Sequence, residues 1–392
     1  MRRRDLFALG AGGVALAAGP AQSARPTSPG QAPARHLGPR TAGKLKLGCQ
    51  SRPSTDEHFA FLARFGVTNL CAAANMADRT RAYPTLDELS QLKEMAERHS
   101  LSLDVFNPAV LGSTHIDVEK HPAIMLADSP ERDRDIEGFQ TLIEHCAKVG
   151  IPGIKYNMSL LGVLRNFEAP GRGGLAYTGW DYASARPKTP LTRAGPVNAD
   201  AFWERITYFL DRVVPVADQY KVKLACHPQD PGVPPSGYQG VDRVLGTVEG
   251  LKRFVAIKES LYHGLNFCQG TVSEDLEDPA TQIFDVIRWF GTRKKIFNVH
   301  FRNIRGHRNH FVETFHDEGD VDMFRAMLTY KEVGFDGMLM PDHVPVLPVK
   351  SGGAYAYNLS AETEDDRDGH LENFAFAYGY IRGLIQAVEH VA

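Results

Sequence analysis

Past Gly43, short runs of strand-forming residues alternate with longer segments in which apolar residues recur every three or four positions. Short runs of this kind are typical of strands, and the longer spacing is typical of helices that bury one face. In the segment 85–99, the residues that would share the buried face are Leu86, Leu89, Leu92, Met95 and Ala96. The pattern therefore predicts an α/β protein in which helices cover a sheet.

Eight candidate strands can be placed in this way, at residues 44–48, 67–72, 102–106, 153–157, 222–227, 264–268, 296–300 and 337–340. Helical segments between them include residues 85–99, 133–149, 199–220, 279–290 and 321–333. This alternation predicts a single (β/α)8 TIM barrel, and a doubly wound open sheet is the alternative. The Gly- and Pro-rich stretch 169–197 is too long for an ordinary connection, so we interpret it as an active-site loop or an oligomer contact.

The first 24 residues contain the parts of an export signal. Three arginines precede a stretch of small apolar residues, and cleavage near Ala21 or Ala24 would follow. Paired arginines before Asp-Leu-Phe resemble a twin-arginine signal, which implies export of a folded protein. The alternative is a disordered basic N-terminus of a cytosolic protein. Residues 25–43 have the composition of a disordered linker, so the barrel would occupy residues 44–392.

The composition is that of an ordinary globular protein. The 392-residue chain is 43% hydrophobic and 23% charged, with 44 basic and 47 acidic residues. A formal net charge of −3 without a long run of either sign argues against nucleic acid as a partner. The apolar N-terminal stretch is far shorter than the roughly 20 residues that span a bilayer, so we expect no membrane anchor. Five cysteines in so long a chain exclude a disulfide scaffold.

Four side chains of metal-binding type follow four successive predicted strands: His227, Cys268, His300 and Asp342. The carboxyl ends of parallel strands converge on one rim of a barrel, where such enzymes have their active sites. Two imidazoles, a thiolate and a carboxylate could hold one divalent cation there, and the thiolate favours iron, zinc or manganese over magnesium or calcium. Each residue alone could be an ordinary core or turn residue. Their joint placement at strand ends favours a metal site.

The motifs around these residues resemble those of the mannonate dehydratases, metal-dependent lyases with a xylose-isomerase-like barrel. The similarity is strongest over residues 220–345. The matching motifs are His-Pro-x-Asp-Pro in 226–231, the stretch 266–270 around Cys268, His-x-Arg in 299–303, Phe-His at 315–316, Gly-Asp-Val-Asp-Met at 319–323, Pro-Asp-His at 341–343 and Tyr-Ile-Arg-Gly at 380–383. The resemblance implies that the four residues bind Fe(II) or Mn(II) and that His343 is a catalytic acid/base. The implied reaction converts D-mannonate to 2-keto-3-deoxy-D-gluconate with loss of water.

The residue types suit that reaction. Dehydrating a sugar acid requires removal of the proton beside the carboxylate and protonation of the departing β-hydroxyl, and His343 could serve either step. Arg302 could clamp the substrate carboxylate with two hydrogen bonds, although a salt bridge at the barrel rim would explain it equally well. Asp230 and Lys258 are weaker candidates. Asp230 could orient His227, with a role in a turn as the alternative.

Several positions depart from the family pattern. A His pair that the family has near the end of the second strand is replaced by Cys-Ala-Ala-Ala-Asn at 71–75, and Met340 occupies the place of an arginine. The family's catalytic tyrosine after the last strand has no single counterpart. His370, Tyr355 or Tyr357 could each replace it. The sequence therefore defines the metal site better than the substrate.

We therefore expect a metal-dependent hydro-lyase acting on D-mannonate or a related small sugar acid. The export signal predicts a periplasmic location, or a cytoplasmic one if the N-terminus is not a signal. One alternative is a metal-dependent sugar isomerase or epimerase of the same barrel class, which the thiolate and the Pro-Asp-His motif disfavour. Another is a non-catalytic carbohydrate-binding barrel. The family resemblance also implies a homo-oligomer.

Overall fold

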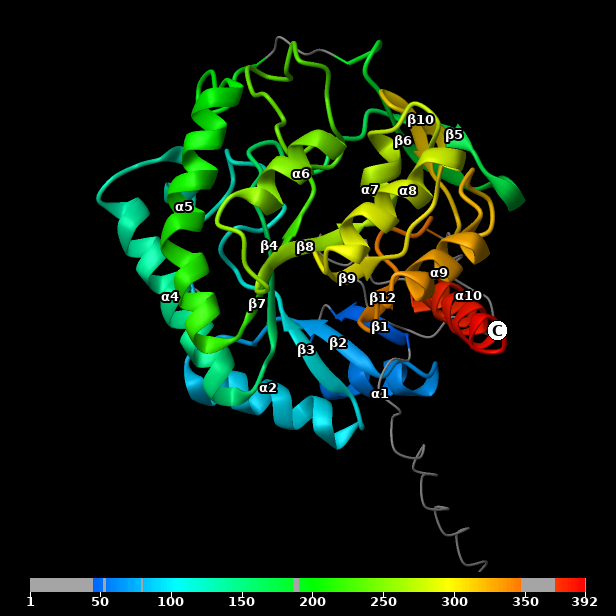
Figure 1. Cartoon of the computed structure of the whole chain (residues 1–392), viewed down its shortest axis with the longest axis horizontal. Helices are drawn as coiled ribbons and strands as arrows, with labels where there is room; N and C mark the ends of the chain where they lie inside the picture. The colour runs from blue at the N-terminus through cyan, green and yellow to red at the C-terminus, as the bar shows by residue number, and fades with distance from the viewer. Residues whose placement is uncertain (1–44, 52–53, 79, 186–189, 347–370, 392) are drawn as a thin grey trace, which may run out of the picture. The chain divides into compact units, whose positions relative to one another are not determined.

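The computed structural model describes residues 45–51, 54–78, 80–185, 190–346 and 371–391. Its centre is a closed barrel of parallel strands in the order β1-β12-β9-β8-β7-β4-β3-β2, as Figure 1 shows. The strands are β1 (Lys46–Ser51), β2 (Asn69–Ala72), β3 (Ser102–Phe106), β4 (Gly153–Asn157), β7 (Lys223–His227), β8 (His263–Cys268), β9 (Ile296–His300) and β12 (Met338–Met340). Closure of the sheet confirms the predicted TIM barrel and excludes the open sheet.

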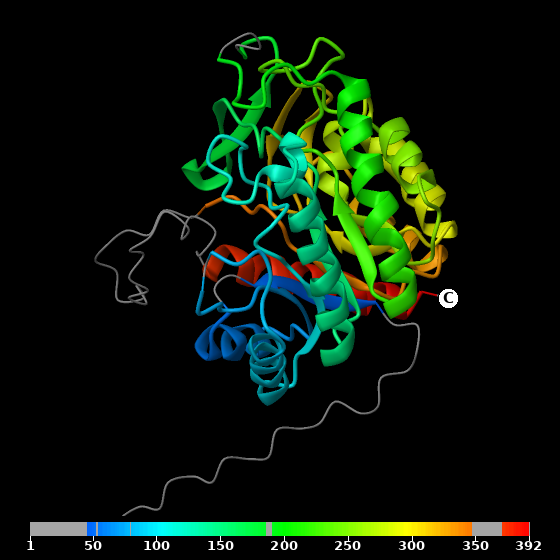
Figure 2. The same cartoon turned by 90° about the vertical axis from the view of Figure 1, so that its left-hand side faces the viewer.

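The helices follow the predicted segments closely. They are α1 (Asp56–Arg64), α2 (Leu86–Arg98), α3 (Ala123–Leu126), α4 (Glu131–Val149), α5 (Ala199–Tyr220), α6 (Val248–Ala256), α7 (Gln269–Glu274), α8 (Pro279–Thr292), α9 (Met323–Glu332) and α10 (Leu371–Glu389). Helix α2 begins with a capping box between Thr85 and Glu88 and buries Leu89, Leu92 and Ala96, as its periodicity predicts. In Figure 2, α10 lies alongside β1.

A second, smaller sheet lies outside the barrel and was not predicted. It has the strand order β10-β11-β6-β5. Strands β5 (Phe167–Pro170) and β6 (Ala176–Asp181) lie between β4 and α5, whereas β10 (Ile304–His307) and β11 (His310–Glu313) follow β9. Pairing of β6 with β11 joins two insertions that are distant in sequence. Within the stretch 169–197, interpreted above as an active-site loop or an oligomer contact, residues 169–170 and 176–181 are therefore strand.

Several sequence predictions fall outside the described residues. These are the signal segment 1–24, the linker 25–43, and the acid/base candidates Tyr355, Tyr357 and His370. Among the helices of the described ranges, none is long and apolar enough to cross a bilayer.

Candidate metal centre

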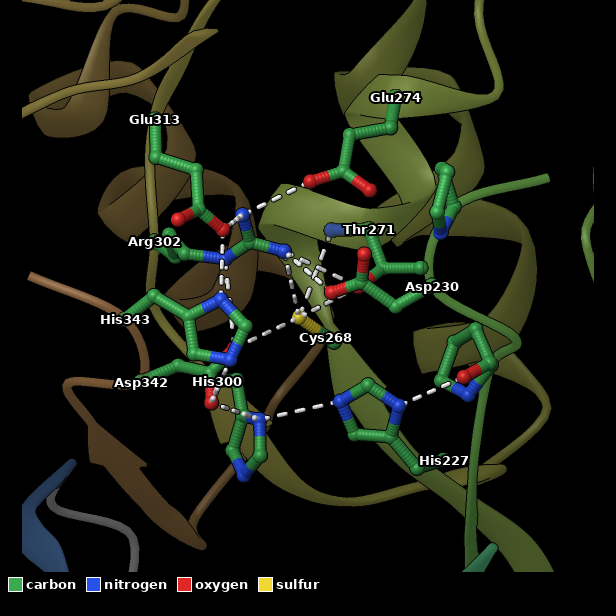
Figure 3. Close-up of polar contacts among 12 residues, drawn as sticks. His227, Asp230, Cys268, Thr271, Glu274, His300, Arg302, Glu313, Asp342 and His343 are labelled. Atoms are coloured by element: carbon green, nitrogen blue, oxygen red, sulfur yellow. Dashed lines mark hydrogen bonds and ion pairs between the residues drawn. The ribbon is translucent and has the colours of Figure 1, made fainter. Parts of the chain in front are cut away.

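The four predicted ligands meet at the carboxyl ends of β7, β8, β9 and β12, as Figure 3 shows. His227, Cys268 and His300 are the last residues of their strands, and the pairing of β8 with β9 sets Cys268 level with His300. The ligand atoms of all four residues lie within 4.8 Å of one another. A single divalent cation could therefore contact all four.

The two imidazoles face each other. Nε2 of His227 lies 3.2 Å from Nδ1 of His300, and the same Nδ1 lies 3.2 Å from an oxygen of Asp342. Nδ1 of His227 lies 2.6 Å from the carbonyl oxygen of Pro228 and donates to it, which leaves the lone pair of Nε2 directed at the centre. Burial, helped by His300 and Lys155, lowers the pKa of His227 to about 3, and burial also lowers the pKa of His300. Both rings are therefore neutral, the form that binds metals.

The Asp342 carboxyl and the Cys268 thiol differ in protonation state. Burial alone would raise the pKa of Asp342, but His300 and His343 hold it well below the ordinary value, so the carboxylate is charged. Burial raises the pKa of the Cys268 thiol. Thr271 compensates in part, because its hydroxyl lies 3.1 Å and its backbone nitrogen 3.4 Å from Sγ, and both donate to the sulfur. A divalent cation that favours thiolate would displace the thiol proton, so the four donors fit such a metal.

Arg302 is engaged with carboxylates. It is 0% exposed. Its guanidinium nitrogens lie 3.0 Å from Asp230, 2.7 Å from Glu274, 2.9 Å from Glu313 and 3.3 Å from Asp342. These contacts favour the salt-bridge explanation over the predicted substrate clamp. A buried guanidinium with four carboxyl partners has no free edge for another carboxylate.

A second arginine joins the small sheet to this network. Arg165 precedes β5, and its guanidinium lies 2.7 Å from Asp230, 3.3 Å from Glu274 and 2.5 Å from Glu313. Asp230 therefore bonds to arginines rather than orienting His227. Lys258 lies outside the site, paired with Asp211 at 3.3 Å. Sequence reasoning missed Arg165 and Glu313, because no local motif signals partners so distant along the chain.

His343 is held beside the centre by Glu313. Its Nδ1 atom lies 2.5 Å from a Glu313 carboxylate oxygen. Burial opposes a charge on the ring, but Asp342 and Glu313 outweigh burial and raise the pKa of His343 to about 10. The side chain is 29% exposed and lines the central cavity. The two carboxylates thus favour the protonated form of His343, whose ring faces the cavity.

The central cavity has a volume of about 120 Å³. Its walls include His227, His300, Asp342 and His343 from the metal centre, together with other polar side chains: Gln50, His58, Lys155, Asn157 and Gln229. The sequence analysis did not select these additional residues. A signal was present in β4, where the polar residues Lys155 and Asn157 occupy alternate positions and thus share one face of the strand.

Comparisons with known proteins show one enzyme family and one fold. The family model for D-mannonate dehydratase (UxuA) matches residues 162–390, more than half of the chain. Mannonate dehydratase 2 of Halalkalibacterium halodurans is 30% identical over 285 residues, covering 66% of this chain and 78% of that protein. Among solved structures, mannonate dehydratase from Streptococcus suis serotype 2 aligns with a TM-score of 0.67 at 23% identity, over 88% of this chain and 94% of that one. A xylose isomerase domain protein from Planctomyces limnophilus aligns with a TM-score of 0.54 at 12% identity, over 88% of this chain and 98% of that one.

Proposed function

Because the chain belongs to the D-mannonate dehydratase (UxuA) family and is therefore a hydro-lyase, we propose that it dehydrates D-mannonate or a related sugar acid in a metal-dependent reaction. The product from D-mannonate would be 2-keto-3-deoxy-D-gluconate. The observation that carries this proposal is the four-donor cluster with the His343 imidazole held at its edge by Glu313.

We propose Fe(II) or Mn(II) as the metal. His227, Cys268, His300 and Asp342 would hold it, and this mixture of nitrogen, sulfur and oxygen donors suits such cations better than magnesium or calcium. When bound, the cation supplies Lewis-acid stabilisation of the negative charge that develops beside the substrate carboxylate.

His343 is suited to act as the general acid. Loss of the β-hydroxyl requires a proton on the departing oxygen, and a protonated imidazole that lines the cavity can supply it. Glu313 fixes the ring by accepting from Nδ1, and Nε2, which lies 3.9 Å from an oxygen of Asp342, is the nitrogen that would serve the substrate. The complementary base stays a prediction: His370, Tyr355 and Tyr357 are the candidates, and all lie outside the described residues.

The first experiment is anaerobic incubation of the Fe(II)- or Mn(II)-loaded full chain with D-mannonate, scored by mass spectrometry. We expect loss of one water per substrate, abolished by a chelator. A product of unchanged mass would instead indicate an isomerase or epimerase. Absence of any turnover with metal bound would reject D-mannonate as the substrate.

The N-terminal arginine motif supports a periplasmic location for this reaction. Fractionation of cells that express the full chain tests this part separately. Recovery of the processed protein in the periplasm is expected, and recovery of only uncleaved protein in the cytosol would reject export.

A further inference from the structure

Lys155 lies in the interior of the barrel, on β4. Its side chain is 5% exposed and lines the central cavity together with Asn157, two residues further along the same strand. The pairing of β4 with β7 sets Asn157 beside the metal-ligand candidate His227. Lys155 thus lies two residues below the level of the metal centre, on the face of the strand that Asn157 also occupies.

The Lys155 ammonium is positioned from across the barrel. Its Nζ atom lies 2.7 Å from Oε1 of Gln50 and donates to it, and Gln50 comes from β1. Lys155 lines the same cavity as the metal-ligand candidates His227 and His300. The Lys155 ammonium group is therefore close to the place where substrate chemistry would occur.

Among the described residues that line the cavity, Lys155 is the one lysine or arginine. Arg302 and Arg165, the nearest guanidinium groups of the charged network, do not line the cavity and are held by Asp230, Glu274 and Glu313. A sugar acid brings a carboxylate into a site that already contains Asp230 and Asp342. Besides His343 and the proposed metal ion, Lys155 is the positive group that the described part of the cavity wall offers to such a carboxylate.

We propose that Lys155 binds the substrate carboxylate and makes the site select sugar acids over neutral sugars, with Gln50 holding the ammonium in place. This inference rests on the proposed function, because it assigns the group that recognises the proposed substrate. Lys155 thus takes the role of binding the substrate carboxylate that the sequence analysis suggested for Arg302. A charge-assisted hydrogen bond of this kind contributes enough to change affinity by roughly 10- to 100-fold.

The test compares Lys155→Met, which keeps the length of the side chain, with Lys155→Arg, which keeps its charge. Lys223→Met is the matched control, because Lys223 is an exposed lysine at the opposite end of the neighbouring strand β7. Steady-state kinetics with D-mannonate should show KM raised roughly 10- to 100-fold in Lys155→Met, partly restored in Lys155→Arg and unchanged in Lys223→Met. An unchanged KM in folded, metal-loaded Lys155→Met would overturn the assignment.

A binding measurement separates this inference from the proposed function. Calorimetry with D-mannonate and with D-mannitol, which carries CH2OH in place of the carboxylate, needs no turnover. If the wild-type chain binds D-mannonate more tightly than D-mannitol and Lys155→Met loses that preference, Lys155 recognises the carboxylate even if no water is eliminated. If Lys155→Met keeps the wild-type preference, Lys155 is not the anchor, whatever the reaction. Equal thermal midpoints of the variants verify that each is folded.

Discussion

Nδ1 of His343 lies 2.5 Å from a carboxylate oxygen of Glu313, and the two residues come from different sheets. His343 follows barrel strand β12, whereas Glu313 ends β11 of the small antiparallel sheet. The other oxygen of Glu313 accepts from the Thr178 hydroxyl on β6 at 2.8 Å. The small sheet thus presents a carboxylate to the proposed general acid, which gives the insertions a role in the site.

Replacing His343 removes the proposed proton donor. We expect His343→Gln to lower kcat for D-mannonate by roughly 10²- to 10⁴-fold, the usual contribution of general acid catalysis. Metal content should stay at the wild-type level, because His343 is not among the four donors. Turnover by metal-loaded protein and elemental analysis check both parts, and a variant that keeps wild-type activity would disprove the assignment.

Glu313→Gln keeps the size of the side chain but removes the charge that orients His343. We expect kcat to fall roughly 10-fold or more, as for the loss of other supporting carboxylates. Because Glu313 helps to raise the pKa of His343, the loss of activity at alkaline pH should move to lower pH. Thr178→Val, which removes a hydrogen bond to Glu313 but no charge, is the control and should retain the wild-type pH profile. A Glu313→Gln profile that matches the wild type would show that the carboxylate does not act through His343.

Cys268→Ser tests the metal centre. A hydroxyl is a much poorer ligand than a thiolate for Fe(II) or Mn(II), so metal retained per chain after dialysis should fall at least about tenfold. Cys146→Ser is the matched control, because Cys146 is also buried but belongs to the core of α4. Elemental analysis of both variants measures the metal retained per chain. Equal retention in the two would exclude Cys268 as a ligand.

Gly270 leaves space for Arg302. A Cβ atom at Gly270 would lie 2.5 Å from Nε of Arg302, a side chain that is buried and tied to several carboxylates. Gly270→Ala should therefore lower the free energy of unfolding by roughly 1–3 kcal/mol. Gly379→Ala is the control, because its Cβ in α10 would meet nothing within 4 Å and alanine favours a helix. Denaturant unfolding compares the two, and equal stabilities would show that Arg302 adjusts without cost.

His263 should make the barrel sensitive to acid. Burial lowers its pKa from 6.5 to about 4, and its Nε2 lies 2.9 Å from the carbonyl oxygen of Phe254. Between these two pH values the unfolded chain binds a proton that the folded chain does not, so stability falls as pH drops from about 6.5 to 4. For His263 this loss amounts to about 3 kcal/mol of the free energy of unfolding. His263→Gln should show a shallower loss in denaturant titrations across this range, whereas the exposed His390→Gln should keep the wild-type slope.

Much of the barrel could be predicted because its signals are local. Strands β3, β4 and β9 have the bounds expected from short apolar runs, and α5 has the bounds expected from its helical periodicity. The convergence of His227, Cys268 and His300 followed from one topological rule, because parallel strands bring their carboxyl ends to the same rim. The strand and helix bounds depend on residues within a few positions of one another, and the convergence needs only the order of the strands, so a sequence displays both directly.

The partners of the charged residues were decided by tertiary structure alone. Arg302 has the same neighbours in sequence whether it holds a substrate or four carboxyl groups. Only the packing of α7 and β11 around the end of β9 brings Glu274 and Glu313 to it. The small sheet likewise depends on pairing between β6 and β11, which are far apart along the chain. The sequence by itself thus determined the barrel and the meeting of the candidate metal ligands through local periodicity and strand topology. Long-range packing decided which carboxylate holds His343 and which cation faces the cavity, because ion pairing depends on distance in space rather than on position in the chain.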